Sequence, residues 1–174
     1  MGDIEILGIP IPDAGPVFLT ALTIHVAAGL TCVTCGAVAA LTRKGGRPHR
    51  RFGRAYFWSL LVVFVTLTVM SAIRWRENVH LFAIGILAFT AALAGYLNRR
   101  RRPRFHAGGM GLSFVAMVTG FYVDNGPHLP LWNRLPEVAY WVLPGLVGLP
   151  LIARAMRRSP ARAEGDQQEA TQGA

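Results

Sequence analysis

The sequence predicts an all-α integral membrane protein, a helical bundle of five spans. The first observation is composition: 52% of the residues are hydrophobic and only 16% are charged, against about 25% charged in an ordinary soluble domain. The second is that residues 17–42, 55–73 and 79–98 contain no Lys, Arg, Asp or Glu. An apolar run of this length is typical of a membrane-spanning helix. The third is that the cations gather in alternate loops.

The predicted spans follow one another with short loops between them. They cover residues 17–41, 55–73, 79–97, 107–123 and 138–153. The fifth is interrupted by Pro144 and Pro150, so an interfacial or re-entrant segment is the alternative there. Residues 1–16 are expected to form an external N-terminal segment, and residues 154–174 a disordered, basic and polar cytoplasmic tail.

The charge distribution predicts the orientation of these spans. The chain has 18 Lys and Arg against 9 Asp and Glu, a net charge of +9. Fifteen of the 18 cations lie in residues 42–54 and 98–106 and in the tail. The positive-inside rule therefore predicts an external N-terminus and a cytoplasmic C-terminus in a cell inner (plasma) membrane. The same rule explains the net charge of +9 without a nucleic-acid-binding function. The expected partner of the basic loops is therefore the lipid bilayer.

Four histidines indicate an internal repeat. His25 and His80 lie in the first and third spans, 55 residues apart, and His49 and His106 precede the second and fourth spans, 57 residues apart. Both units enter the membrane from the same side. We therefore predict a four-span core made of two parallel two-helix repeats, to which the Pro-interrupted fifth span is added.

Polar side chains within a membrane are costly, so each of these histidines is a functional hypothesis. For His25 the alternative is a core histidine bonded to a neighbouring helix, and for His49 a solvated loop residue. The face of the first span that carries His25 also carries Gly29, Cys32 and Gly36. Such small residues either permit close helix contact or leave space for a flat group bound by the histidine.

These histidine pairs resemble those of the ascorbate-reducible two-haem b-type cytochromes. The resemblance implies that His25 and His80 ligate the iron of an outer haem b, and His49 and His106 that of an inner one. A second resemblance is to a family of uncharacterised bacterial multi-pass membrane proteins with the pattern His…His-Arg-Arg-x-Gly-Arg-x-Tyr, which is residues 49–56 in this chain. In this chain His49 lies outside its predicted span, which makes the inner haem the less supported of the two.

Two other sites compete with the haem. His80, Asp124 and His128 are expected on the external side, and histidines with a carboxylate are the ligand set of a catalytic zinc site. This set gives the alternative of a metal-dependent membrane hydrolase. Cys32 and Cys35 form a Cys-x-x-Cys pattern, but they lie in mid-span in apolar surroundings, where cysteine packs as a small hydrophobe.

The sequence thus favours a small b-type haem protein that transfers electrons across or within the membrane. A haem-free membrane protein with a structural or assembly role and the metal-dependent hydrolase remain the alternatives. The electron donor and acceptor, a quinone site and homo-oligomerisation are left open.

Overall fold

The computed structural model describes residues 3–6, 9–12 and 15–158, and the side chains of 15–157. A short antiparallel hairpin comes first, β1 (Asp3–Ile6) with β2 (Ile9–Pro12), and the sequence analysis did not predict it. Five helices follow, with two 3-10 turns, at Gly126–His128 and Trp132–Arg134, before the last. The helices are α1 (Pro16–Leu41), α2 (Arg47–Ile73), α3 (Trp75–Leu97), α4 (Pro103–Asn125) and α5 (Glu137–Arg158).

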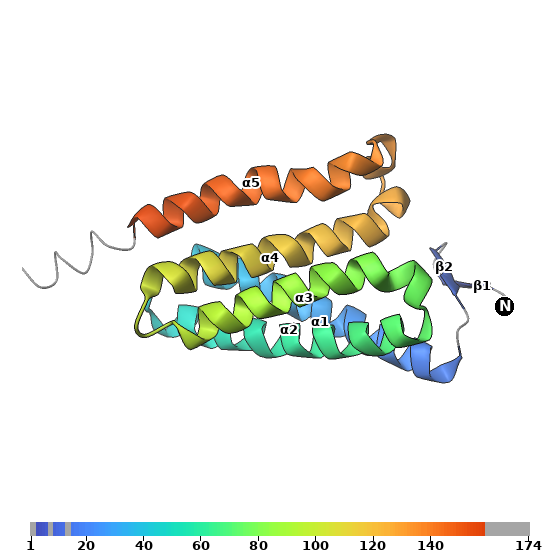
Figure 1. Ribbon diagram of the computed structural model, residues 1–174, viewed down its shortest axis with the longest axis horizontal. Coiled ribbons are helices and arrows are strands. Elements are labelled where there is room, and N and C mark those ends of the chain that lie inside the picture. The colour runs from blue at the N-terminus through green and yellow to red at the C-terminus, as the bar shows by residue number, and fades with distance from the viewer. Residues whose placement is uncertain (1–2, 7–8, 13–14, 159–174) are drawn as a thin grey trace, which may run out of the picture.

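The helices run alternately up and down along one long axis (Figure 1). α1 packs against α2 and α3 against α4, α2 joins the two pairs through α3, and α5 packs on α4. Each of the five is long and apolar enough to cross a membrane. The chain is therefore a multi-pass membrane protein, and the predicted all-α class with five spans is confirmed.

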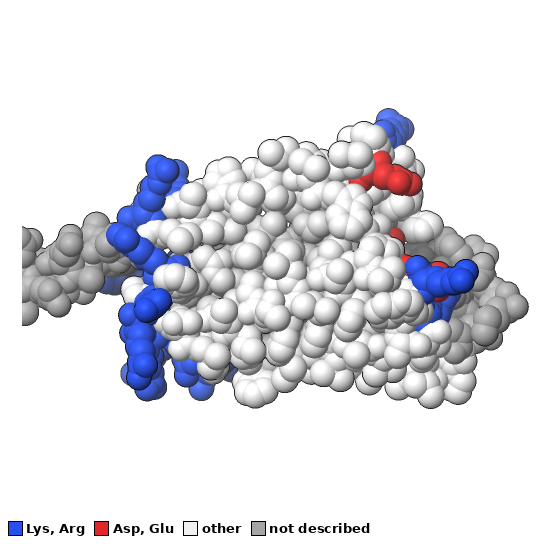
Figure 2. Space-filling view, viewed as in Figure 1, with Lys and Arg blue, Asp and Glu red and all other residues white. Residues whose placement is uncertain are grey.

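The two ends of the bundle differ in charge (Figure 2). We call one the basic end: it holds the α1–α2 turn (residues 42–46), the α3–α4 turn (98–102) and the end of α5. The other, the opposite end, holds the start of α1, the α2–α3 joint and the loop before α5. Residues 1–2, 7–8, 13–14 and 159–174, which include most of the predicted disordered tail, lie outside the described residues.

All five helices extend beyond the predicted spans, and α2 does so by the most. α2 begins at Arg47 rather than at residue 55, because Pro48 suits the first turn of a helix and cations are tolerated where that turn leaves the membrane. His49 therefore lies within α2 and not in a loop. α5 reaches Arg158 and continues through Pro144 and Pro150.

The main core lies in the half of the bundle nearer the basic end. Its buried residues come from α1, α2 and α3: they are Cys32, Cys35, Tyr56, Phe57, Leu60 and Ala92. A smaller cluster of Phe18, Ala21 and Met70 fills the opposite end.

A ladder of aromatic rings joins α2 to α3 along most of their length. On α3 the rings recur every seven residues, at Trp75, Phe82, Phe89 and Tyr96. Phe57 of α2 stacks on Tyr96 with centroids 4.3 Å apart, and Phe64 of α2 stacks on Phe89 at 4.9 Å. Because aromatic pairs stabilise beyond the area they bury, this ladder is the principal joint between the two helix pairs.

The backbones of α3 and α4 approach each other so closely that a side chain on Gly109 would not fit between them. A Cβ on Gly109 would lie 2.6 Å from the carbonyl oxygen of Ala91 and 2.9 Å from the Cα of Gly95. Small residues at such crossings let helix backbones meet.

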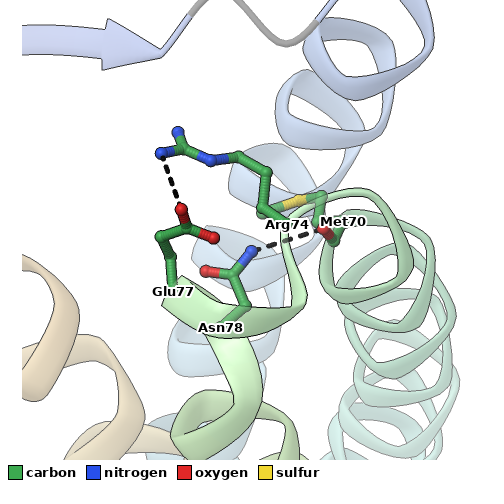
Figure 3. A network of polar contacts seen from close by, with 4 residues as sticks. All are labelled: Met70, Arg74, Glu77 and Asn78. Carbon is green, nitrogen blue, oxygen red and sulfur yellow. Dashed lines mark hydrogen bonds and ion pairs between the residues drawn. The ribbon is translucent and has the colours of Figure 1, made fainter.

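At the opposite end, polar contacts close the α2–α3 joint (Figure 3). The Arg74 guanidinium lies 3.8 Å from the Glu77 carboxylate, and the side-chain amide of Asn78 donates to the carbonyl of Met70 at 3.3 Å. Tyr140 of α5 is buried and donates its hydroxyl to the carbonyl of Trp132 at 2.9 Å. These contacts fix both connections at this end.

Candidate functional site: a histidine pair at the basic end

His49 and His106 lie together at the basic end, one on each of the two helices that start there. Their ring centroids are 6.1 Å apart and the ring planes are perpendicular. Nδ1 of His49 donates to the carbonyl of Ala39 at 2.9 Å, and Nδ1 of His106 donates to the carbonyl of Gly95 at 3.0 Å. Each histidine therefore bonds the helix that precedes its own.

The helical hairpins explain why both rings occupy equivalent positions. The last carbonyls of an α-helix have no partner within the helix. Ala39 and Gly95 lie in the last turns of α1 and α3, and a tight turn returns the chain so that the first turn of the next helix passes beside them. His106 supplies a donor to Gly95, and His49 donates to Ala39 together with the Thr42 hydroxyl, which lies 3.2 Å from the same carbonyl. Each ring thus caps the preceding helix.

These bonds also determine which nitrogen carries the proton. A carbonyl oxygen only accepts, so Nδ1 of each ring is the N–H, and Nε2 of the neutral ring keeps its lone pair. Within the part of the chain whose side chains are described, no hydrogen bond engages Nε2 of either residue. An Nδ1–H bonded to a backbone carbonyl is the arrangement that orients histidine as a metal ligand.

Positive charge surrounds the pair. Lys44 and Arg99 lie close enough to His106 for their charges to act on its ring. Lys44 donates to the carbonyl of Ala40 at 2.9 Å, and partial desolvation lowers the pKa of Lys44. Arg99 donates to the carbonyl of Tyr96 and covers its ring at 4.1 Å. An anionic group bound at the pair would therefore meet two cations.

Apolar residues lie one turn further into the membrane from each histidine. Phe52 and Met110 are partly buried against the main core, and a Cβ on Gly53 would meet nothing within 4 Å. Two turns in, Tyr56 and Ser113 share a buried hydrogen bond of 2.6 Å between α2 and α4. The hydrogen bond between Tyr56 and Ser113 therefore lies about 10 Å along the helix axes from the histidine pair.

At the opposite end His25 has a different partner. Its Nδ1 lies 3.0 Å from the hydroxyl of Thr66 on α2. The one proton of that hydroxyl points to the carbonyls of Val62 and Val63, at 2.8 and 3.0 Å. Nδ1 of His25 is therefore the donor. This is the core histidine bonded to a neighbouring helix that the sequence analysis weighed for His25.

His80 does not share that environment. It is exposed on α3, and its ring faces Trp141 of α5 with centroids 6.2 Å apart. The exposed carboxylate of Asp124 interacts electrostatically with His25, His80 and His128. Nevertheless, residues 15–157 contain no group of three or more His, Cys, Asp or Glu placed to hold a metal ion. The zinc site at His80, Asp124 and His128, the alternative of the sequence analysis, stays a prediction.

The small residues on the His25 face of α1 were expected either to permit close helix contact or to leave open space, and the structure shows both. Gly36 is packed, since a Cβ there would lie 2.7 Å from the ring of Phe114. Cys32 is fully buried and donates to the carbonyl of Tyr56 at 3.6 Å. Gly29, one turn from His25, has open space at its Cβ position.

The sequence analysis missed Tyr56 and Ser113 as a polar bridge, and Lys44 and Arg99 as cations beside the histidines. A signal was present: Tyr56 and Ser113 each lie seven residues after a histidine of the pair, and Lys44 and Arg99 differ by the repeat offset of 55.

Comparisons of this chain with protein-family models, with curated proteins and with solved structures give no match.

Proposed function

We propose that this protein binds a haem b between His49 and His106 at its basic end and transfers electrons there. The observation that carries the proposal is the pair itself: two rings 6.1 Å apart, each with Nδ1 bonded to a backbone carbonyl. Two histidines whose Nε2 atoms make no hydrogen bond within the described residues are a donor set that haem iron accepts, and these two residues would hold the group.

The chain's own residues have definable tasks in such a site. The carbonyls of Ala39 and Gly95 hold the two rings in position and keep each proton on Nδ1. Lys44 and Arg99 would offset the negative charge of the haem carboxylates, and Phe52 and Met110 would exclude water on the membrane side. When bound, haem supplies one-electron redox chemistry, and its axial ligands are a main determinant of the potential.

The resemblance to two-haem cytochromes implies a second haem at His25 and His80, and this stays a prediction. We place the proposed site at the basic end because the rings of His49 and His106 contact each other, whereas the ring of His80 faces Trp141 rather than His25. The electron donor, the electron acceptor and a quinone site are not defined by these contacts.

The absorbance spectrum of the purified protein, expressed with ample haem, tests the proposal. We expect a reduced-minus-oxidised spectrum of a six-coordinate b-type haem, and its loss in both His49→Ala and His106→Ala. His128→Ala, an exposed residue away from the pair, is the control and should retain the spectrum. A colourless wild-type protein would favour the haem-free structural role, and stoichiometric zinc in that sample would favour the hydrolase.

We further propose that the basic end faces the cytoplasm of a cell inner (plasma) membrane, as the positive-inside rule requires. In a background with Cys32 and Cys35 replaced by Ala, Gly45→Cys should react with an impermeant thiol reagent only from the cytoplasmic side. Pro127→Cys, in the exposed turn at the opposite end, should react only from outside. The reverse pattern would invert the orientation.

A further inference from the structure

The outward face of α2 changes character along the helix. From the basic end it presents exposed Arg47, Arg50, Arg51 and Arg54, which we call the arginine stripe. Trp58 follows, with 58% of its surface exposed, and then exposed Val62, Val65 and Val69. At 100° per residue, Arg51, Arg54 and Trp58 lie within about 40° of Arg47. The cations, the tryptophan and the valines therefore share one face.

The other face of α2 belongs to the bundle. His49 and Tyr56 lie about 200° and 180° from Arg47 by the same rule, and Tyr56 is only 2% exposed. The pattern at residues 49–56 is thus divided by the helix: its histidine and tyrosine point inward and its three arginines outward. The arginines do not line the histidine pair.

The profile of this face places the stripe at a defined depth. Exposed valines are typical of contact with lipid chains, and tryptophan concentrates at the boundary between chains and headgroups. Arg54 lies one turn beyond Trp58, and Arg47 lies about 10 Å further along the axis. α2 has 27 residues, about 40 Å of helix against about 30 Å of hydrocarbon. The stripe therefore lies at the level of the headgroups and faces sideways.

Within the described residues, the stripe has no negative partner. In the described part of the chain, the ion pair is Arg74–Glu77, at the opposite end. The described side chains of Asp and Glu also lie at that end. Arginine binds phosphate through a planar, bidentate set of donors, and a lateral face at headgroup depth meets lipid before it meets any protein from the cytoplasm.

We propose that the arginine stripe is a binding site for the phosphate groups of anionic phospholipids, which it selects over zwitterionic ones. This inference is independent of haem binding. Arg100, Arg101 and Arg102, in the α3–α4 turn at the very end of the bundle, carry the same charge but are followed by exposed Phe105 rather than by a tryptophan.

Trp58 provides the probe, because the other three tryptophans, Trp75, Trp132 and Trp141, lie at the opposite end. The full-length protein is reconstituted in phosphatidylcholine vesicles that contain a minor fraction of either brominated phosphatidylglycerol or brominated phosphatidylcholine. Quenching that is lost in Trp58→Phe is assigned to Trp58. We expect the anionic lipid to quench Trp58 at least about twofold more strongly, and raised salt to reduce the difference.

A matched pair of variants locates the site. Replacing Arg47, Arg51 and Arg54 together by Gln should remove the preference, whereas replacing Arg100, Arg101 and Arg102 by Gln should retain it. Equal quenching by the two lipids in the wild type would overturn the proposal, and so would equal loss in both triple variants. The wild-type comparison decides the matter even if one triple variant fails to fold. Inorganic phosphate in the buffer should not compete, and competition by it would identify a site for free anions instead.

Discussion

The two ends of the bundle both carry histidines, yet they use them differently. At the basic end, His49 and His106 are equivalent: each starts a helix, caps the helix before it and approaches the other ring to 6.1 Å. At the opposite end, His25 donates to a threonine, His80 faces a tryptophan and His128 is exposed in a turn. Each end therefore holds one histidine pair of the sequence repeat, but the surroundings of the two pairs differ.

The difference shows what places a side chain in a membrane bundle. A short hairpin brings the first turn of one helix beside the unpaired carbonyls at the end of the other, and it does so twice in a repeat. No such constraint acts on His25 and His80. The histidine pair at the basic end is therefore placed by local connection, whereas His25 and His80 are placed by side-chain packing.

The largest expected effect, and the most direct test of the difference between the two ends, is on the amount of haem bound per chain. Relative to the wild type, we expect His49→Ala to lose the haem of the pair and His25→Ala to keep it, because only the first removes a ligand of the pair. Haem extracted per mole of protein measures all three. Two haems in the wild type, with one lost in His25→Ala, would place a second site at the opposite end and make the ends alike.

A smaller effect separates packed from open glycines. Gly109→Ala should destabilise the protein by about 1–3 kcal/mol, because its Cβ would meet the backbone of α3 and force the helices apart. Gly29→Ala, where the Cβ position is open, should be neutral or should stabilise α1 by up to about 1 kcal/mol. Reversible unfolding in mixed detergent measures both. Equal destabilisation by the two changes would contradict the close α3–α4 contact.

The polar bridge below the pair should contribute about as much as a single buried hydrogen bond. Tyr56→Phe leaves the buried hydroxyl of Ser113 without a partner, at a cost of about 1–3 kcal/mol. Adding Ser113→Ala should recover part of that loss, since neither polar group then remains. A double-mutant cycle on the same unfolding assay gives the coupling, and strictly additive losses would show that the bridge does not form.

The smallest effect is expected at the cysteines. Cys32 and Cys35 are buried and free, and the sequence contains no other cysteine. Replacing both by Ala should leave haem content and electron transfer within roughly a few-fold of the wild type, since buried cysteine acts as a small apolar residue. A folded double variant with no turnover would show a redox role that packing does not explain.

Much of the candidate site could be inferred from the order of residues. The offset of 57 between His49 and His106 already paired them as equivalent positions of a repeat. The depth of His49 could not be inferred, because hydropathy detects the apolar part of α2 and not its charged first turns. The aromatic ladder was readable as a spacing of seven on α3, but the partner rings on α2 become evident only when the helices are side by side.

The sequence by itself determined the class of protein, the spans and the segregation of charge. These depend on the transfer of side chains between water and lipid, which is a property of each segment alone. The tertiary structure decided which histidines meet, which glycines are packed, and which side of α2 faces lipid. Those features depend on how far one helix is rotated and shifted against another, and that is settled by contacts such as Gly95 with Gly109 and Phe57 with Tyr96, between residues far apart in the chain.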